Sequence, residues 1–407
     1  MATESVQESV PGYRTSLSQA EILDWKTRPA SQQPEWGDDW LVDKIRTDLS
    51  ELPALTTESE VDTVRRRTAR VAAGELVVIQ AGDCAEDPEE CEPGALSAKL
   101  GLLEALAGLL RVCSGKPVVR VGRIAGQFAK PRSKPTERHG ELELPAYRGP
   151  LVNDPAPDPA SRRPDPLRML AAYHASHAAQ DFLREQRMDP RLPQSSEVWT
   201  SHEALVLDYE LPLVRRVSSG QRVLASTHWP WIGERTRDPD GAHVALLASV
   251  VNPVACKVGP TTTPEELLAL CARLDPQREA GRLTLISRMG PAATASRLPT
   301  LVATVRAAGH PVSWLCDPMH ANTIVGPGSR KTRKVDTVLA EVSAFLTAVR
   351  AARGVPGGLH LETTPTDVTE CVRDEGQLEE LASARYTTLC DPRLNPQQAL
   401  AVVGAWR

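Results

Sequence analysis

The sequence predicts an α/β protein, a (β/α)8 TIM barrel with an N-terminal helical extension. From residue 75 onward, eight short apolar runs alternate with amphipathic helical stretches, which is the pattern of parallel strands joined by helices. This part of the chain is long enough for such a barrel with insertions. A doubly wound sheet is the runner-up on pattern alone, but no GxGxxG motif follows the first run. We therefore expect an extension over residues 1–74 and a catalytic barrel over residues 75–407.

The extension reads as three helices. Helical spacing is found at 18–28 and 38–52, separated by the Pro-containing stretch 29–37. The third helix, 57–75, starts with Thr57, a good N-cap residue, and runs into Gly74, a good stop. We expect these helices either to cover the floor of the barrel or to form an interface between subunits.

The barrel is predicted element by element from the apolar runs. The expected strands are 75–80, 117–123, 197–203, 226–235, 252–259, 283–290, 311–318 and 357–363. Amphipathic helices are expected between most of them, as at 95–112, 165–186, 263–274, 298–309 and 335–352. The Pro-rich, charged stretch 131–165 follows the second strand, and a loop that long is either functional or disordered. We favour function, because its start carries cationic residues.

Composition excludes several classes of protein. The 407 residues carry a net charge of −5, and no basic stretch lacks interleaved acids, which disfavours nucleic acid as a partner. No apolar run is long enough to span a membrane, and the first residues lack the regions of a signal peptide. Eight cysteines spread over this length do not indicate a disulfide framework. We expect a cytoplasmic enzyme or binding protein.

The ends of the expected strands carry reactive and charged residues instead of the usual loop residues. In a barrel of this kind the functional site is built where the strands end. The residues found there are Cys84, Arg123, His202, Glu203, Glu234, Arg235, Lys257, Arg288, His320 and Glu362. Such a convergence predicts a site at this rim.

One group of these residues suits a metal ion. Cys84, His320, Glu362 and Asp391 offer sulfur, nitrogen and carboxylate oxygen, a plausible set for Mn²⁺, Co²⁺, Fe²⁺ or Zn²⁺. Each also has an ordinary structural reading, since a cysteine after a strand is usually a small buried hydrophobe. Spacing alone leaves both readings open.

A second group suits phosphate and carboxylate. Only nine lysines are present among the 47 basic residues, so a lysine within a motif is informative. Guanidinium groups bind these anions through paired hydrogen bonds, and lysine acts as a point charge. Since any one of these residues could be a solvated surface group, the argument depends on the cluster. Its members are Arg123, Arg235, Lys257 and Arg288 at four strand ends, and Lys130, Arg132, Ser133 and Lys134 in one loop.

Taken together, these stretches resemble type II 3-deoxy-D-arabino-heptulosonate 7-phosphate (DAHP) synthases. The resemblance covers almost the whole chain after residue 70, and its motifs occur in family order. They are GDCAE (82–86), RVGRIAGQFAKPRS (120–133), TSHEALVLDYE (200–210), WIGERTR (231–237), GAHV (241–244), NPVACKVGP (252–260), SRMG (287–290), DPMHANT (317–323), GGLHLETTPTDVTEC (357–371) and LCDPRLN (389–395).

The resemblance implies a metal-dependent barrel enzyme for the first step of the shikimate pathway. Members condense phosphoenolpyruvate with erythrose 4-phosphate and water, giving DAHP and phosphate. The implied metal ligands are Cys84, His320, Glu362 and Asp391, with Mn²⁺ or Co²⁺ as the first choices and Zn²⁺ or Fe²⁺ as alternatives. The implied phosphoenolpyruvate contacts are Arg123, Glu234, Arg235, Lys257 and Arg288, of which the first four are also assigned to catalysis. The implied erythrose 4-phosphate contacts are Lys130, Pro131, Arg132 and Ser133.

The chain is similar to the short members of the family. It has no room after the second strand for the helical pair that binds aromatic amino acids in longer members, and it resembles the forms found in phenazine and other secondary-metabolite clusters. We therefore expect no feedback inhibition by Phe, Tyr or Trp. A homodimer or homotetramer is implied by the resemblance. Two alternatives stay open: an amino or imino analogue of erythrose 4-phosphate as acceptor, and a barrel whose main role is to bind a partner such as a chorismate mutase.

A redox hypothesis concerns Cys390, which precedes Asp391 and should lie near Cys84. A disulfide between Cys84 and Cys390 would remove a metal ligand and stop activity. The alternative is that Cys390 is simply buried. The other six cysteines are expected to be packing residues.

Overall fold

The chain forms a closed parallel barrel. The computed structural model describes Leu17 and residues 24–189, 197–217 and 219–407. Eight strands pair in the order β5-β2-β1-β14-β11-β10-β9-β8. A parallel bridge between Glu203, just after β5, and Trp231 of β8 joins the two ends of this sheet. The strands are β1 (Val77–Gly82), β2 (Val118–Arg123), β5 (Val198–Thr200), β8 (Trp231–Ile232), β9 (Val254–Val258), β10 (Leu283–Ser287), β11 (Ser313–Cys316) and β14 (Val355–Glu362).

All eight expected strands are confirmed, although some are shorter than expected. The strand expected at 226–235 contains only the two residues of β8, because Pro230 has no N–H to give to a ladder. Strands such as β9 and β10 are buried along their whole length, as parallel strands covered on both faces must be. This double burial explains why they read as unbroken apolar runs.

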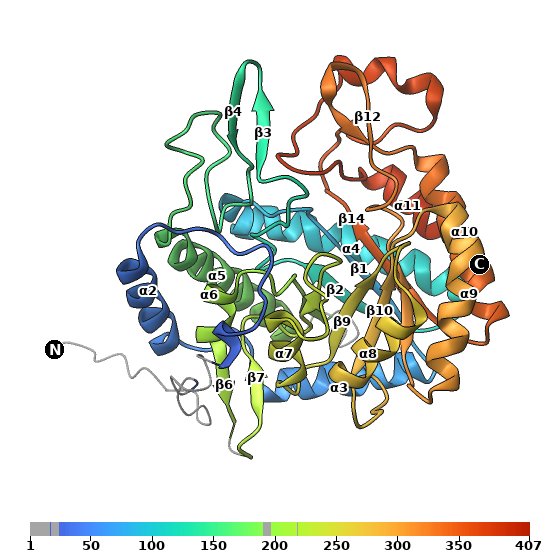
Figure 1. The fold of residues 1–407 in the computed structure, drawn as a ribbon. Coiled ribbons are helices and arrows are strands. Elements are labelled where there is room, and N and C mark those ends of the chain that lie inside the picture. The colour runs from blue at the N-terminus through green and yellow to red at the C-terminus, as the bar shows by residue number, and fades with distance from the viewer. Residues whose placement is uncertain (1–16, 18–23, 190–196, 218) are drawn as a thin grey trace.

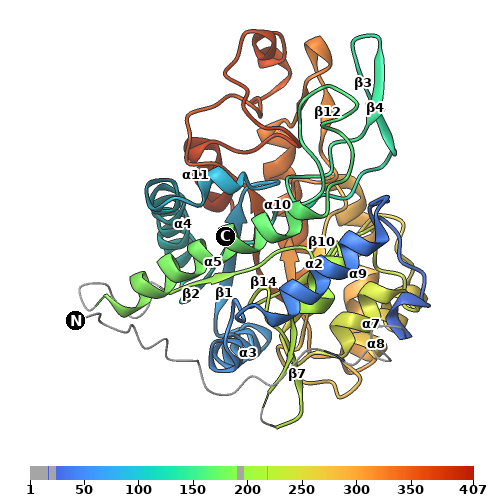
Figure 2. The same cartoon turned by 90° about the vertical axis from the view of Figure 1, so that its left-hand side faces the viewer.

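Helices surround the barrel on the outside (Figures 1 and 2). They are α4 (Pro93–Ser114), α5 (Leu167–Met188), α7 (Ala242–Ala248), α8 (Pro264–Leu274), α9 (Pro291–Ala307), α10 (Val335–Ala351) and α11 (Pro396–Gly404). No helix was expected after the third strand, and none of length is found there: the short α6 (Leu207–Glu210) is followed by a 3₁₀ turn at Leu211–Leu213 and the hairpin β6 (Val214–Arg216)–β7 (Arg222–Leu224). Pro212 and Gly220 interrupt this stretch and favour turns over a long helix.

The N-terminal extension supplies the floor of the barrel. The expected helices at 38–52 and 57–75 are confirmed as α2 (Asp39–Glu51) and α3 (Glu58–Ala72), whereas most of the one expected at 18–28 lies outside the described residues. Helix α3 lies across the end of the barrel opposite the β3–β4 and β12 loops (Figure 1). Its Val64 and Val71 pack into the same apolar cluster as barrel residues such as Val78 and Trp231.

Ion pairs hold α3 to α5. Glu60 lies 3.3 Å from Arg184 Nε and also contacts Arg187. Burial alone would raise the pKa of the Glu60 carboxyl, but contact with His228 and the charges of the two arginines outweigh burial and lower it. Glu60 is therefore ionised in the folded protein and anchors the floor helix.

The opposite end of the barrel carries long excursions. The hairpins β3 (Thr136–His139)–β4 (Leu142–Pro145) and β12 (Ile324–Val325)–β13 (Lys331–Thr332) rise there beside a segment that follows β14 (Figures 1 and 2). That segment contains short 3₁₀ turns at Glu375–Gln377 and Glu379–Ala382. Two further 3₁₀ turns, outside that segment, lie at Pro88–Cys91 and Pro327–Ser329. These excursions surround the carboxyl ends of the strands, where the site residues are expected.

Candidate active site

A cavity of about 430 Å³ opens at the carboxyl ends of the barrel strands. The site residues implied by the family resemblance all line it, from nine separate segments of the chain, whereas His202, also noted at a strand end, does not. The residues that line it are Cys84, Arg123, Lys130, Pro131, Arg132, Ser133, Glu234, Arg235, Lys257, Arg288, His320, Glu362 and Asp391. The structure therefore brings together groups that lie more than 300 residues apart in the sequence.

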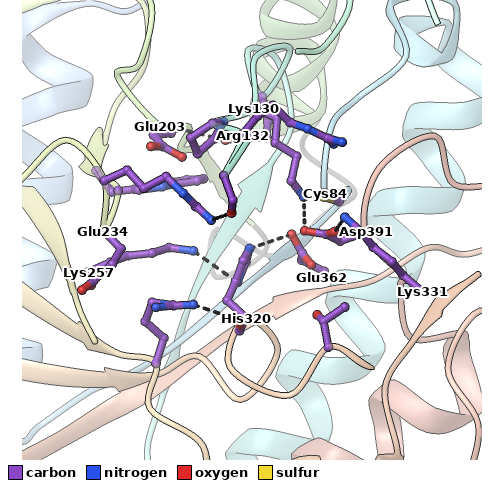
Figure 3. A pocket seen from close by; sticks show the side chains of 18 of the residues that line it. Cys84, Lys130, Arg132, Glu203, Glu234, Lys257, His320, Lys331, Glu362 and Asp391 are labelled. Atoms are coloured by element: carbon purple, nitrogen blue, oxygen red, sulfur yellow. Dashed lines mark hydrogen bonds and ion pairs between the residues drawn. The ribbon is translucent and has the colours of Figure 1, made fainter. Parts of the chain in front are cut away.

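Potential metal ligands gather on one side of this cavity (Figure 3). One donor atom each from Cys84, Glu362 and Asp391 lie within 4.8 Å of one another. His320 completes the set, with its Nε2 3.1 Å from Glu362 Oε1. Thiolate, imidazole and two carboxylates are a chemically suitable donor set for a first-row divalent metal, so these residues fit such an ion.

Asp317 orients the imidazole of His320. An oxygen of Asp317 lies 2.8 Å from His320 Nδ1, which leaves Nε2 directed toward Glu362. The same carboxylate accepts a hydrogen bond from Lys257 Nζ at 2.9 Å. A carboxylate behind a histidine fixes the ring and its tautomer in many metal sites.

Cations surround the carboxylates of the potential metal ligands. Lys130 Nζ contacts the Cys84 sulfur and lies 2.5 Å from Asp391 Oδ2, while Lys331 Nζ lies 2.8 Å from the other oxygen of Asp391. Arg333, which is fully buried, lies 2.7 Å from Glu362 Oε2. Burial alone would raise the pKa of Glu362, but the charges of His320, Arg333 and Lys130 outweigh burial and lower it.

The cysteine is held as a thiol in this setting. Burial raises the pKa of Cys84 well above its ordinary value, and a hydrogen bond with Cys390 and the charge of Glu362 act in the same direction. Cys84 and Cys390 also pack together with Tyr147. A thiol in such surroundings becomes a thiolate when a cation binds to it.

Arg123 is fixed rigidly beside these groups. Its Nε donates to the carbonyl oxygen of Asp83 at 2.9 Å, and its Nη1 donates to Nε2 of the buried His360 at 2.8 Å. The guanidinium lies 5.2 Å from the ring centre of Trp231, within range of a cation–π interaction. An arginine held on several sides can bind an anion without first losing its own freedom.

Lys257 stands on the same side of the cavity as Glu234 (Figure 3). Burial and the like charge of Arg123 lower the pKa of its ammonium group, although Asp317 opposes this shift. Arg288 Nη2 donates to the carbonyl oxygen of His320 at 2.9 Å. Gly259 leaves room for Glu234, because a Cβ at that position would lie 2.4 Å from Glu234 Oε1.

The cationic loop at 130–133 faces this group across the cavity. Arg235 Nη2 donates to Ser133 Oγ at 2.5 Å, and Arg132 Nη2 lies 2.5 Å from Glu137 Oε2 at the base of the β3–β4 hairpin. The two groups of residues that are expected to bind anions therefore touch directly.

Asp83 and Glu86, on either side of Cys84, support the loops. Asp83 is buried between Lys99 Nζ at 2.9 Å and Arg393 Nη1 at 2.7 Å. Glu86 accepts hydrogen bonds from the backbone N–H groups of residues 125–127, where the chain turns after β2. Both acids shape the site without facing the cavity.

Several residues that line the cavity were not assigned a role from the sequence. Glu203 was noted at the end of a strand but was given no role. Lys331 could have been singled out from the sequence, because the chain has only nine lysines. Glu137 carried no signal, since it lies outside the strand ends and the quoted motifs, and Thr323 was marked only as the last residue of the motif DPMHANT. The remaining unassigned residues are Gln127, Thr136, Trp231 and Gly233, and Lys134, expected in the cationic loop, also lines the cavity.

Glu203 stands out among them. Its Oε1 is buried and has no hydrogen-bond partner among the described residues, and Gly233 leaves space for it. Burial raises the pKa of its carboxyl, although Lys257 and other cations oppose the shift. A buried carboxyl with a raised pKa and a free oxygen in a cavity is suited to proton transfer.

No helix among the described residues has the length and apolar character needed to cross a membrane.

The model of the class-II DAHP synthetase family matches residues 20–190 and 185–405. A probable phospho-2-dehydro-3-deoxyheptonate aldolase of Pseudomonas fluorescens is 53% identical over 93% of this chain and 94% of its own length. The phospho-2-dehydro-3-deoxyheptonate aldolases of Streptomyces coelicolor and Mycolicibacterium smegmatis are 41% and 38% identical, each over 92% of this chain and over 94% and 91% of their own lengths. This chain therefore belongs to the class-II DAHP synthetase family of enzymes.

Proposed function

We propose that this DAHP synthase condenses phosphoenolpyruvate with erythrose 4-phosphate and water, releasing phosphate, with the help of a divalent metal ion. One observation supports the proposal most strongly: a single cavity is lined by a metal-type donor set and by two adjoining groups of cations. Two phosphorylated substrates repel each other, and the cations offset that repulsion.

Each group of residues has a part in the proposed reaction. Arg123, Arg235, Lys257 and Arg288 bind the carboxylate and phosphate of phosphoenolpyruvate, and Glu234 lies beside them. Lys130, Arg132 and Ser133 bind the phosphate of erythrose 4-phosphate, with Pro131 shaping their loop. Cys84, His320, Glu362 and Asp391 would hold the metal, which supplies Lewis acidity to the aldehyde oxygen when bound.

The carbon chemistry follows from this placement. The enol carbon of phosphoenolpyruvate attacks the aldehyde carbon, and positive charge develops at C2. Water adds at C2, and phosphate then leaves from the tetrahedral intermediate. We assign the exchange of a proton with the reacting molecules to Glu203, because this residue lines the cavity and its buried Oε1 has no hydrogen-bond partner among the described residues.

We further propose that the enzyme supplies DAHP to a secondary-metabolite route, of the phenazine kind, without feedback by aromatic amino acids. Among the described residues, one helix, α5, lies between β2 and β5, which leaves no inserted helical pair there. The alignment with the Streptomyces enzyme spans 424 positions, more than the 407 residues of this chain, so that relative contains segments that this chain lacks.

The test is phosphate release from phosphoenolpyruvate and erythrose 4-phosphate. Enzyme treated with EDTA is assayed before and after addition of Mn²⁺ or Co²⁺, with Zn²⁺ and Fe²⁺ for comparison. We expect turnover that EDTA abolishes and that Mn²⁺ or Co²⁺ restores, unchanged when Phe, Tyr or Trp is added. No turnover with metal bound contradicts erythrose 4-phosphate as the acceptor, and the imino analogue is then the substrate to assay.

A further inference from the structure

The stretch 29–33 of the N-terminal extension lies on the rim of the active site. Ser31 Oγ donates a hydrogen bond to the carbonyl oxygen of Arg235 at 2.8 Å, next to the phosphoenolpyruvate group. Gln33 Nε2 donates to the carbonyl oxygen of Leu205 at 2.9 Å, in the loop after β5. A segment that precedes the barrel in sequence is therefore fastened to the loops that carry its chemistry.

Gln32, between these two residues, is fastened to the cationic loop. Its Oε1 accepts a hydrogen bond from the Arg132 backbone N–H at 2.8 Å and a longer one from Arg148 Nη2 at 3.4 Å. Arg148 Nη2 also donates to the backbone oxygen of Gln32 at 2.7 Å. The backbone oxygen of Arg148 in turn accepts from the Lys130 N–H at 2.9 Å. Both ends of the loop from Lys130 to Arg132 are thus held by this pair.

The backbone of Gln32 has a conformation that side chains other than glycine rarely adopt. Its φ is +65°, in the left-handed region. A residue held in that region is costly and persists where its surroundings demand it. Glycine would remove the cost but would also remove the side-chain oxygen. A glycine here would keep the backbone conformation and lose the oxygen that accepts the hydrogen bond from the Arg132 N–H.

The cationic loop has little to hold its shape by itself. It contains no helix or strand, and Pro131 has no N–H to donate. Two contacts fix Arg132. Its guanidinium pairs with Glu137, and its backbone N–H donates to Gln32 Oε1. Without that contact, the Arg132 backbone could rotate and turn Ser133 away from the cavity.

We propose that Gln32 is a positioning residue for the sugar phosphate, acting through the backbone of Arg132. It holds the loop of Lys130–Ser133 in the shape that binds the phosphate of the acceptor substrate. The identity of that substrate rests on the proposed function, whereas the effect on the loop does not.

The substitution Gln32→Gly tests this proposal, because glycine keeps the backbone conformation and removes only the side chain. We expect the KM for erythrose 4-phosphate to rise about tenfold, through loss of a hydrogen bond to the loop and one to an arginine. The KM for phosphoenolpyruvate and kcat should stay within about twofold of the wild-type values, since the other loops keep their contacts. Hydrogen exchange at the Arg132 amide should become about tenfold faster in the free enzyme.

Arg353→Gly is the matched control. Arg353 is an exposed residue with φ +56° beyond the end of α10, so glycine suits its backbone equally well. We expect this variant to leave both KM values and Arg132 exchange unchanged.

The outcomes separate this inference from the proposed function. An unchanged KM for erythrose 4-phosphate with unchanged Arg132 exchange overturns the inference, and so does an equal rise of both KM values with a lower melting temperature. If the wild-type enzyme does not turn over erythrose 4-phosphate at all, the proposed function fails, and faster Arg132 exchange in Gln32→Gly still supports positioning of the loop.

Discussion

Asp83 and Arg393 lie 310 residues apart in the sequence and form an ion pair of 2.7 Å in the folded protein. Asp83 precedes the potential metal ligand Cys84, and Arg393 follows the potential ligand Asp391 by two residues. Arg393 also contacts the buried Glu370 at 2.8 Å. The ion pair therefore ties the two loops that present these ligands to each other.

Replacing Arg393 by methionine should weaken metal binding. Supporting groups around metal ligands are typically worth about 10–100-fold in metal affinity, and we expect a loss of that size for Arg393→Met. Titration of EDTA-treated enzyme with Mn²⁺ measures it. The control is Arg70→Met. Arg70 lies on the floor helix α3 and forms an exposed ion pair with Glu75, so its replacement should leave the affinity for Mn²⁺ unchanged. Equal affinity in the Arg393 variant would contradict the role assigned to this pair.

Replacing Glu203 by glutamine should slow the chemical step. The amide cannot exchange a proton, so kcat should fall by about 10²–10⁴-fold, while the KM for phosphoenolpyruvate stays within about threefold. Steady-state kinetics with both substrates measure the two effects. A variant that keeps full kcat would show that the free oxygen of Glu203 takes no part in proton transfer.

Replacing Glu60 by glutamine should destabilise the protein in a pH-dependent way. Because Glu60 pairs with two arginines in a largely buried place, we expect a loss of about 3 kcal/mol in the free energy of unfolding near neutral pH. The folded-state pKa of Glu60 lies below the ordinary value of 4.5, so its contribution is present above that pH and disappears as the pH falls through the lowered pKa. Urea unfolding at about pH 7 and about pH 3 should show the difference between variant and wild type shrinking on acidification. A difference that does not depend on pH would mean that lost packing, and not charge, is responsible.

Oxidation should inactivate the enzyme through Cys84 and Cys390. Hydrogen peroxide takes two electrons and two protons from the two thiols, forming one disulfide and water, and the metal loses its sulfur ligand. We expect loss of both thiols, of bound metal and of activity, reversed by dithiothreitol. Cys390→Ser should keep its metal after the same treatment, whereas Cys113→Ser should behave as the wild type does. Oxidised wild-type enzyme that retains its full metal content would contradict this prediction.

The barrel strands were predictable because burial on both faces produces apolar runs such as Val254–Val258, which stand out against the helices around them. The rim residues were predictable because reactive side chains at strand ends converge in this fold. The turn after β5 was not, since Pro212 and the hairpin β6–β7 replace a helix without changing the order of the strands. Pro212 and Gly220 disfavour a long helix in this stretch, but they do not specify the hairpin that takes its place.

Lys331 and Glu137 show why part of the site escaped prediction. Both lie in hairpins outside the barrel, and tertiary contacts decide where these hairpins sit. The Tyr386 hydroxyl donates to the carbonyl oxygen of Lys331 at 2.9 Å, and Arg330 donates to the carbonyl oxygen of Leu381 at 2.7 Å. Partners more than 50 residues away leave no periodic pattern in the sequence.

The floor helix α3 precedes every barrel strand in the chain, and this order matters during synthesis on the ribosome. β1 and β2 emerge next, while β14, which pairs with β1, emerges last of the eight. Until then an edge of β1 lacks its partner and the inner face of the growing sheet is exposed, a state that invites aggregation. Val64 and Val71 of α3 are already available to cover that face. We therefore expect α3, which closes the barrel from below in the folded enzyme, to cover this apolar face during synthesis, and the potential metal ligands Cys84 and Glu362 to come together only when β14 pairs with β1.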